Sequence, residues 1–309
     1  MCDCARDELP AGRGDVVGSE SRWSAVSRCE MMRSILPWAA VVASASLAWE
    51  PLPPRATPRM VDVHNAWSKQ VPYADALKLQ RQLLAERTAA LREPSRGSHA
   101  DCLLLVQHPP VFTLGTRSSL DNLRSSSLPF ELYRTERGGE VTYHGPGQLV
   151  LYPIIDLRHY RQDVHWYLRS LEEVALRVLR SLQLPARREP GLTGAWVDDA
   201  KVCATGVKLS RWVTMHGLAL NVDVDLSHFE HIVPCGIADR PVTSIRKELV
   251  ERGGTVQGAR VDPVGARVDD GDRLMAHVQQ LLLRHFAEVF RVELSCNEEL
   301  YPLLLPPAP

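Results

Sequence analysis

Apolar residues at helical spacing mark three segments of the chain. They recur every three or four positions in Tyr73–Arg92, Asp163–Leu182 and Asp272–Val289, which places them along one face of an α-helix. Pro72 opens the first segment, and proline is well tolerated in a first helical turn. We therefore predict three long amphipathic helices.

Shorter apolar runs between these helices predict strands. They are Cys102–Gln107, Val111–Leu114, Leu149–Ile155, Ala195–Val197, Val202–Val207, Trp212–Met215 and Leu218–Val222. Runs of strands between isolated helices, without regular alternation, indicate an α/β or α+β fold with a mixed sheet flanked by helices. There is no internal repeat, and Thr255–Gly271, rich in Gly, Asp and Arg, is expected to be an exposed loop or insertion.

Residues 1 to about 60 differ from the rest. From Met31 to Trp49, one arginine precedes an apolar centre that ends in small residues, the layout of a cleavable signal segment. It is too short and interrupted to predict a membrane span. We expect residues 1–60 to be a leader that is absent from the folded protein, and residues 61–309 to form one domain that begins near Val61.

The leader predicts an organellar destination. Met31 to Arg59 combines the signal-like run with a Pro- and Arg-rich stretch, and its small residues before an aromatic resemble leaders that route proteins into plastids of secondary origin. A mitochondrial presequence is the alternative. The acidic residues before Met31 do not fit a targeting peptide, so Met31 and Met32 are candidate start residues.

Composition narrows the function classes. The 309 residues are 45% hydrophobic and 24% charged, enough for a full core. A net charge of -1 and the lack of a Lys/Arg tract disfavour a nucleic-acid role. The seven cysteines include no C-x-x-C pair, so neither a zinc site nor a disulfide framework is predicted. Cys102 and Cys203, inside apolar runs, are expected to be buried thiols.

Lysine is scarce, which draws attention to where it is kept. Of the 36 Lys and Arg residues only five are lysine, and Lys201 and Lys208 bracket one unusual segment. A lysine kept among arginines suggests a need for a compact, titratable amine. The alternative is a pair of solvated charges at strand ends.

Three segments crowd glycine with polar, chemically active residues: Arg137–Gln148, Lys201–Lys208 and His231–Ile237. None matches a dinucleotide fingerprint or a phosphate-binding P-loop. Cys235 lies between proline and glycine, which predicts a tight, exposed loop. An exposed thiol becomes a nucleophile where a cation favours its thiolate form.

The sequence leaves the partner of this thiol open. Lys201 is the preferred cation, and His144 and His231 are alternatives. In the first segment, the turn around Gly145 and His144 itself also have plain structural interpretations. Gly138 and Gly139 supply bare backbone on which an acyl chain can lie.

Five segments in this order resemble the lipoyl(octanoyl) transferases: Arg137–Gln148, Thr193–Val197, Lys201–Lys208, His216–Asn221 and Phe229–Ile237. The resemblance covers roughly residues 65 to 250. It implies a fold of the biotin/lipoate protein ligase type. It also implies transfer of an octanoyl or lipoyl group from acyl carrier protein to one lysine of a lipoyl domain, in 2-oxoacid dehydrogenase complexes or the glycine cleavage H protein.

The resemblance also implies roles for particular residues. Cys235 would carry the acyl thioester, and Lys201 would favour its thiolate and help to deprotonate the incoming amine. The substrate-binding residues would be Arg137, Gly138, Gly139, Glu140, Val141, Thr142, Tyr143, His144, Ala204, Thr205, Gly206, Gly217, Leu218 and Ala219. No metal, cofactor or ATP is expected, because the thioester already carries the activation. Backbone N–H groups near Cys235 or in the glycine-rich segment are candidates to hold the oxyanion.

Two other functions compete with this one. A lipoate or biotin ligase would adenylate a free acid, which requires a nucleotide site and no cysteine. A non-catalytic binder of acylated carrier domains would need neither Cys235 nor Lys201. The segment around Glu251 to Asp270 is longer than expected for the family.

Overall fold

A computed structural model describes residues 49–92, 100–125, 127–237, 239–253, 255–256, 259–260 and 271–297. All of them belong to the unit formed by residues 46–309. Residues 1–48, which hold most of the expected leader, lie outside this description. In the described residues, no helix is both long and apolar enough to cross a membrane.

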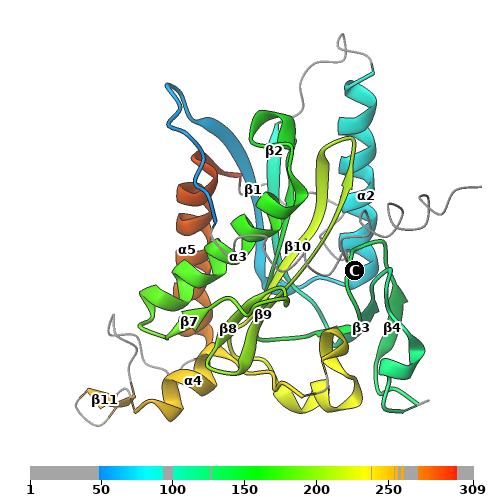
Figure 1. The fold of residues 1–309 in the computed structure, drawn as a ribbon, viewed down its shortest axis with the longest axis vertical. Helices are drawn as coiled ribbons and strands as arrows, with labels where there is room; N and C mark the ends of the chain where they lie inside the picture. The colour runs from blue at the N-terminus through cyan, green and yellow to red at the C-terminus, as the bar shows by residue number, and fades with distance from the viewer. Residues whose placement is uncertain are drawn as a thin grey trace, which may run out of the picture. The chain divides into compact units, whose positions relative to one another are not determined.

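An eight-stranded mixed sheet forms the centre of the unit (Figure 1). Its strand order is β13-β1-β2-β6-β10-β9-β8-β7. The strands are β1 (Arg59–Gln70), β2 (Asp101–Gln107), β6 (Gln148–Ile154), β7 (Ala186–Arg187), β8 (Ala195–Val197), β9 (Ala200–Ser210), β10 (Val213–Asn221) and β13 (Val292–Asn297). β1 pairs in parallel with β2 and β13, and the other neighbours are antiparallel. The predicted mixed sheet flanked by helices is confirmed.

Helices cover the two faces of the sheet unequally. α3 (Val164–Ser181) and α5 (Gly271–Phe290) pack on one face and build the largest apolar core. α2 (Tyr73–Ala90) covers the other face over β6 and β10, with a smaller core (Figure 1). A short helix, α4 (Ile245–Glu251), begins after Ser244, whose side chain accepts the N–H of Lys247. The face under α2 is therefore left partly open.

A second, three-stranded sheet lies beside this open face. It has the order β4-β3-β5, with β3 (Val111–Leu114), β4 (Glu131–Arg134) and β5 (Thr142–His144). Its apolar side packs on residues of the 3₁₀ helix η4 (Leu226–His231) in a third core. Three further 3₁₀ turns are η2 (Leu120–Asn122), η3 (Leu157–His159) and η5 (Pro234–Gly236).

One predicted pair of strands is a single strand. Trp212–Met215 and Leu218–Val222 were expected to be separate, but β10 runs unbroken from Val213 to Asn221. His216 takes a left-handed φ of 60° within the strand. Gly217 does not break the strand; it allows close packing, because a Cβ there would lie 2.1 Å from the carbonyl oxygen of Leu151.

Other expectations shift at the edges. Pro72 is the N-cap of α2 instead of a first-turn residue. β1, β4, β5, β7 and β13 were not predicted. Of the expected loop Thr255–Gly271, the described part is a pair of two-residue strands, β11 (Thr255–Val256) and β12 (Ala259–Arg260), and Gly271 opens α5. The rest of that loop lies outside the described residues.

Ordered contacts begin before the expected start at Val61. Trp49 donates from Nε1 to Ser170 Oγ at 3.0 Å, and Trp166 donates to the carbonyl oxygen of Glu50 at 2.9 Å. Leu52 is buried in the largest core. Residues Trp49 to Leu52 therefore pack on α3 as part of the folded body.

Candidate active site

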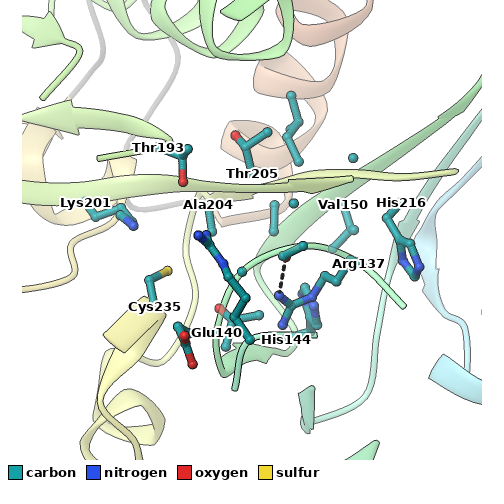
Figure 2. Close-up of a pocket in the computed structure, with 18 of the residues that line it drawn as sticks. Arg137, Glu140, His144, Val150, Thr193, Lys201, Ala204, Thr205, His216 and Cys235 are labelled. Atoms are coloured by element: carbon teal, nitrogen blue, oxygen red, sulfur yellow. Dashed lines mark hydrogen bonds between the residues drawn. The ribbon is translucent and has the colours of Figure 1, made fainter. Parts of the chain in front are cut away.

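A cleft lies between the open face of the main sheet and the segment Arg137–His144. It encloses about 850 Å³ of empty space, part of which is open to solvent. Strands β6, β9 and β10 form one wall, and the segment between β4 and β5 forms the other (Figure 2). The predicted site residues that line it are Arg137, Gly138, Gly139, Glu140, Thr142, His144, Lys201, Ala204, Thr205, Gly206, Gly217, Leu218, Ala219 and Cys235.

A break in the register of β9 aims Lys201 into this cleft. Ala195 pairs with Cys203 and Trp196 with Lys201, so Val202 is an extra residue on β9. Such a bulge reverses which face the following side chains occupy. Val202 and Cys203 both pack in the largest core, and Lys201 falls on the cleft face with Ala204.

Lys201 is held closely although its amine reaches the cleft. The residue is 5% exposed. Its backbone N–H donates to the carbonyl oxygen of Pro241 at 2.9 Å, and its own carbonyl accepts the N–H of Thr243 at 3.0 Å. The amine lies 4.9 Å from the ring centroid of Trp196, within the range of a cation–π contact.

Cys235 lies in η5 in a strained conformation. Its φ of 58° is left-handed, which costs a non-glycine residue about 1 kcal/mol or more. The backbone N–H donates to the carbonyl oxygen of Val141 at 2.9 Å, which helps to hold that conformation. The free thiol is half-buried, and Figure 2 shows it at the same end of the cleft as the Lys201 amine.

The thiol at Cys203 contrasts with that at Cys235. Cys203 is fully buried in the largest core. Burial, and secondarily the charge of Glu172, raises its pKa to about 12, so it remains a thiol near neutral pH. Cys102 is likewise buried, and burial raises its pKa to about 11. Both were expected to be buried, and this is confirmed.

Small residues in register form the floor of the cleft. Gly206 pairs across the strands with Gly217, and Ala204 pairs with Ala219. A Cβ at Gly206 would lie 3.0 Å from the carbonyl oxygen of Gly138, so the opposite wall approaches the floor closely here. Two such pairs extend ~7 Å along the strands. They leave a narrow channel with little side-chain bulk.

Arg137 anchors the wall opposite this floor. Its Nη2 donates to the carbonyl oxygen and Oγ1 of Thr113 at 2.8 and 2.9 Å. Burial lowers the pKa of Arg137, and the nearby acidic groups of Tyr73 and Cys235 oppose that effect. Glu140, further along the wall, accepts from Asn122 Nδ2 at 3.1 Å. Arg137 therefore places a second cation in the cleft.

The assignment of Val141 and Tyr143 to the cleft lining needs correction. β5 alternates, so Thr142 and His144 face the cleft while Val141 and Tyr143 pack in the third core. Tyr143 OH lies 2.7 Å from His228 Nδ1, on the far side. Val141 still matters to the site, because its carbonyl accepts the N–H of Cys235.

The end of the cleft away from Cys235 holds neutral histidines. Burial lowers the pKa of both His144 and His216 to about 3. His144 Nδ1 lies 2.7 Å from Gln148 Oε1. His144 therefore carries no charge with which to activate a thiol, and His231 is not among the residues that line the cleft. Of the alternatives left open by the sequence, Lys201 shares the cleft end of Cys235.

The N–H groups around Cys235 are already used within the protein. That of Cys235 donates to Val141, that of Gly236 to Val233 at 3.0 Å, and that of Ile237 to Pro234 at 3.1 Å. These groups therefore do not provide the oxyanion donors expected near the thiol. Of the described residues, the cationic donors that line the cleft are Arg117, Arg137 and Lys201.

Further residues line the cleft that had not been assigned to it. They are Tyr73, Arg117, Val150, Tyr152, Gly191, Leu192, Thr193, His216 and Ile237. Thr193, His216 and Ile237 belong to segments that carried the resemblance, so that signal was available. Tyr73 and Tyr152 come from a helix start and a buried strand, where the sequence offers no signal.

The fold and the cleft together define an α+β domain with a thiol and an amine at one end of a narrow channel. Among the described residues, no group of three or more His, Cys, Asp or Glu side chains is arranged to hold a metal ion. The protein-family model for the lipoyl protein ligase A/B catalytic domain matches residues 72–259 of this chain.

Comparison with similar proteins identifies the family within this class of catalytic domain. The chain is 45% identical over 242 residues to a chloroplastic octanoyltransferase of Arabidopsis thaliana, covering 77% of this chain and 81% of that protein. It is 53% identical over 196 residues to an octanoyltransferase of Gloeobacter violaceus, covering 63% and 83%. The fold is similar to P. falciparum LipL1 solved with lipoate, at 14% identity and a TM-score of 0.51, covering 80% and 69%. The chain belongs to the octanoyltransferase family, which are acyltransferases.

Proposed function

We propose that this protein moves an octanoyl group from acyl carrier protein to one lysine of a lipoyl domain through a thioester on Cys235. The observation that carries the proposal is the placement of Lys201 and Cys235 at one end of a channel floored by Ala204, Gly206 and their partners. A reactive pair at the mouth of a channel without side-chain bulk suits a straight acyl chain.

The first step exchanges one thioester for another. The Cys235 thiolate, favoured by the Lys201 ammonium, attacks the carbonyl carbon of the carrier-bound octanoyl group. A carbon–sulfur bond to Cys235 forms and the bond to the carrier sulfur breaks. The carrier leaves as a thiol with a proton from Lys201, which becomes a neutral amine.

The second step forms an amide. The acceptor lysine attacks the Cys235 thioester, its nitrogen loses a proton to the neutral Lys201 amine, and Cys235 leaves as a thiolate. Lys201 is an ammonium again, so both groups return to their starting states. Arg137 and Lys201 are the candidate donors to the oxyanion in both steps, since both line the cleft.

The proposed chemistry predicts that octanoyl transfer does not depend on ATP. We expect purified protein to transfer octanoyl from carrier protein to a lipoyl domain at the same rate with and without ATP, as measured by the mass of the acceptor. Strict ATP dependence with free octanoate would instead support a ligase. Tight binding of the acylated carrier with no transfer would support a non-catalytic binder.

The acceptors and the compartment are proposals of the same kind. The acceptors are lipoyl domains of 2-oxoacid dehydrogenase E2 subunits and the glycine cleavage H protein. We place the protein in a plastid, because a chloroplastic relative is 45% identical, and mitochondrial targeting is the alternative. The leader ends before Trp49, since Trp49 and Leu52 pack in the folded body. Fluorescent tagging of a chain that starts at Met31, with sequencing of the mature N-terminus, tests both points.

A further inference from the structure

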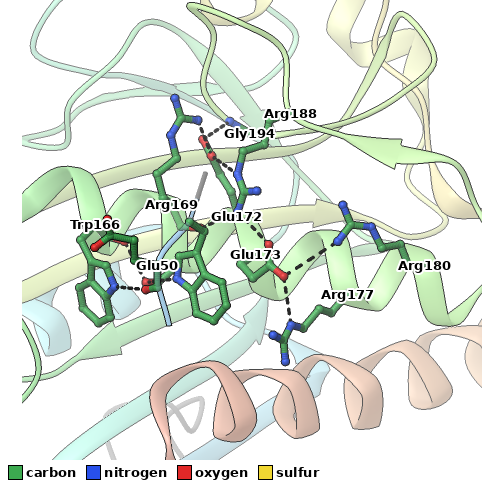
Figure 3. A network of polar contacts seen from close by, with 11 residues as sticks. Glu50, Trp166, Arg169, Glu172, Glu173, Arg177, Arg180, Arg188 and Gly194 are labelled. Carbon is green, nitrogen blue, oxygen red and sulfur yellow. Dashed lines mark hydrogen bonds and ion pairs between the residues drawn. The ribbon is translucent and has the colours of Figure 1, made fainter. Parts of the chain in front are cut away.

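A fully buried acidic side chain stands behind the reactive end of the cleft. Glu172, on α3, is 0% exposed. Its Oε2 accepts from Arg169 Nη1 at 2.6 Å and from Arg188 Nε at 3.2 Å (Figure 3). Burying a charge is expensive unless it is paired and hydrogen-bonded. The two guanidinium groups supply that pairing at one oxygen.

The other oxygen of Glu172 holds the backbone of a loop. Its Oε1 accepts the N–H of Gly194 at 2.9 Å (Figure 3). The residues immediately before Gly194, from Gly191 to Thr193, line the cleft. Because the arginines fix Glu172 on α3, the second bond transmits that fixed position to the cleft wall.

Gly194 in turn packs closely against the backbone of β9 and contacts the side chain of Lys201. Its φ is +105°, and a Cβ there would lie 2.2 Å from the carbonyl oxygen of Cys203 and 3.6 Å from Lys201 Cε. β8 begins at the next residue and carries Trp196, whose ring lies 4.9 Å from the Lys201 amine. A displacement of Gly194 would therefore reach both the strand that bears Lys201 and the ring that faces its amine.

We propose that Glu172 is a positioning residue for Lys201. The bond from Gly194 to Glu172 Oε1 sets the loop, the loop sets Trp196, and together they hold the Lys201 amine at the Cys235 end of the cleft. Glu172 acts through these neighbours, on the cleft wall that they form. The inference rests on the proposed function, in which Lys201 exchanges a proton in each step.

A double-mutant cycle tests the inference. Glu172→Ala, Lys201→Ala and the double variant are compared in steady-state octanoyl transfer from carrier protein to a lipoyl domain. Misplacement of a catalytic group by about 1 Å can cost about 10²-fold in rate, and we expect a loss of that order for Glu172→Ala in kcat with little change in KM. In the Lys201→Ala background, Glu172→Ala should cause less than about a twofold further loss, because residues that act as one unit are not additive.

Several outcomes overturn the inference. Independent losses that multiply in the double variant would show that Glu172 does not act through Lys201, and so would wild-type activity of Glu172→Ala. Either of these two results leaves the proposed function standing, provided that Lys201→Ala itself transfers octanoyl more slowly than the wild type. Full activity of Lys201→Ala would instead remove Lys201 from the proposed function, and this inference with it.

Two further variants separate positioning from stability. Glu172→Asp keeps the charge for the long arginine side chains but withdraws the oxygen from Gly194, and it replaces Glu172→Ala in the cycle if that variant does not fold. The control is Glu173→Ala. Glu173 accepts from Arg177 Nε at 3.1 Å and Arg188 Nη2 at 2.9 Å, so it shares Arg188 with Glu172. We expect Glu173→Ala to change the melting temperature but keep kcat within about twofold. An equal loss of kcat for both glutamates would overturn the inference.

Discussion

The two ends of the cleft hold different titratable groups. At one end, the Lys201 amine and the Cys235 thiol lie together (Figure 2). At the other, His144 and His216 are buried and neutral, because burial lowers the pKa of each to about 3. The charge of Arg137 acts on this second end, where it helps to lower the pKa of both histidines. The pair that is proposed to make and break bonds is thus confined to the first end.

The largest expected effect comes from the reactive thiol. Cys235→Ala should lower octanoyl transfer by at least about 10³-fold, since it removes the nucleophile. The matched control is Cys203→Ala, which should be close to wild type, because Cys203 is buried in the core with its pKa raised to about 12. The measurement is the initial rate of acceptor acylation. If Cys235→Ala were active while Cys203→Ala was folded but inactive, the assignment of Cys235 as the nucleophile would be wrong.

Lys201 tests whether the reactive end needs more than positive charge. Lys201→Arg keeps the charge, but a guanidinium does not exchange a proton near neutral pH, so we expect a loss of about 10²-fold in kcat. Lys208→Arg on the same strand, outside the cleft lining, should remain within about twofold of wild type. Equal activity of the two variants would exclude Lys201 from proton transfer.

The middle of the channel governs which acyl chain fits. Ala204→Val adds bulk to the floor and should lower octanoyl transfer about tenfold while butanoyl transfer falls less, since one or two methylene groups in a pocket shift selectivity by roughly that factor. Ala200→Val, on the same strand but outside the cleft lining, serves as the control. The ratio of the two acyl rates is measured. An unchanged ratio in Ala204→Val would mean that the acyl chain does not lie on this floor.

The smallest effect concerns the neutral end and appears in stability. The pKa of His144 is about 3 in the folded protein, and an unfolded histidine titrates near 6.5. Below about pH 6.5 the unfolded chain therefore takes up protons that the folded protein excludes, and stability falls as the pH is lowered toward 3. Each such histidine contributes up to about 1.4 kcal/mol per pH unit.

His144→Asn removes one of these groups. Its free energy of unfolding, from denaturant titrations between about pH 7 and about pH 5, should fall less steeply with acidification than that of the wild type. The comparison concerns the slope, because the substitution also alters packing. Parallel slopes would show that His144 takes up its proton over the same pH range in the folded and the unfolded protein.

Much of this architecture was predictable from local pattern. The helices α2, α3 and α5 follow from apolar spacing, and the loop at Cys235 follows from its proline and glycine neighbours. β1 and β13 were missed because they pair in parallel across almost the whole sequence, which no local pattern encodes. The alternation of β5 would have separated Val141 and Tyr143 from Thr142 and His144, had that segment been predicted as a strand.

The finer geometry of the site depends on tertiary contacts. The sequence around Val202 and Cys203 is a plain apolar run and does not indicate the β-bulge that directs Lys201 into the cleft. Glu172 lies inside a correctly predicted helix, but its partners Arg188 and Gly194 come from a later loop. The residue types thus predicted the chemistry of the site. The strand register and the burial that bring these groups together could be seen only in the structure.

The most direct test of the central claim is a single-turnover chase. The protein is mixed with octanoyl-carrier protein alone, its intact mass and peptide map are recorded, and a lipoyl domain is then added. The account predicts an octanoyl adduct on Cys235 that forms without ATP and passes to the acceptor lysine at least as fast as steady-state turnover. Transfer to the lipoyl domain with no such adduct, or an adduct that persists when the acceptor is acylated, would contradict it.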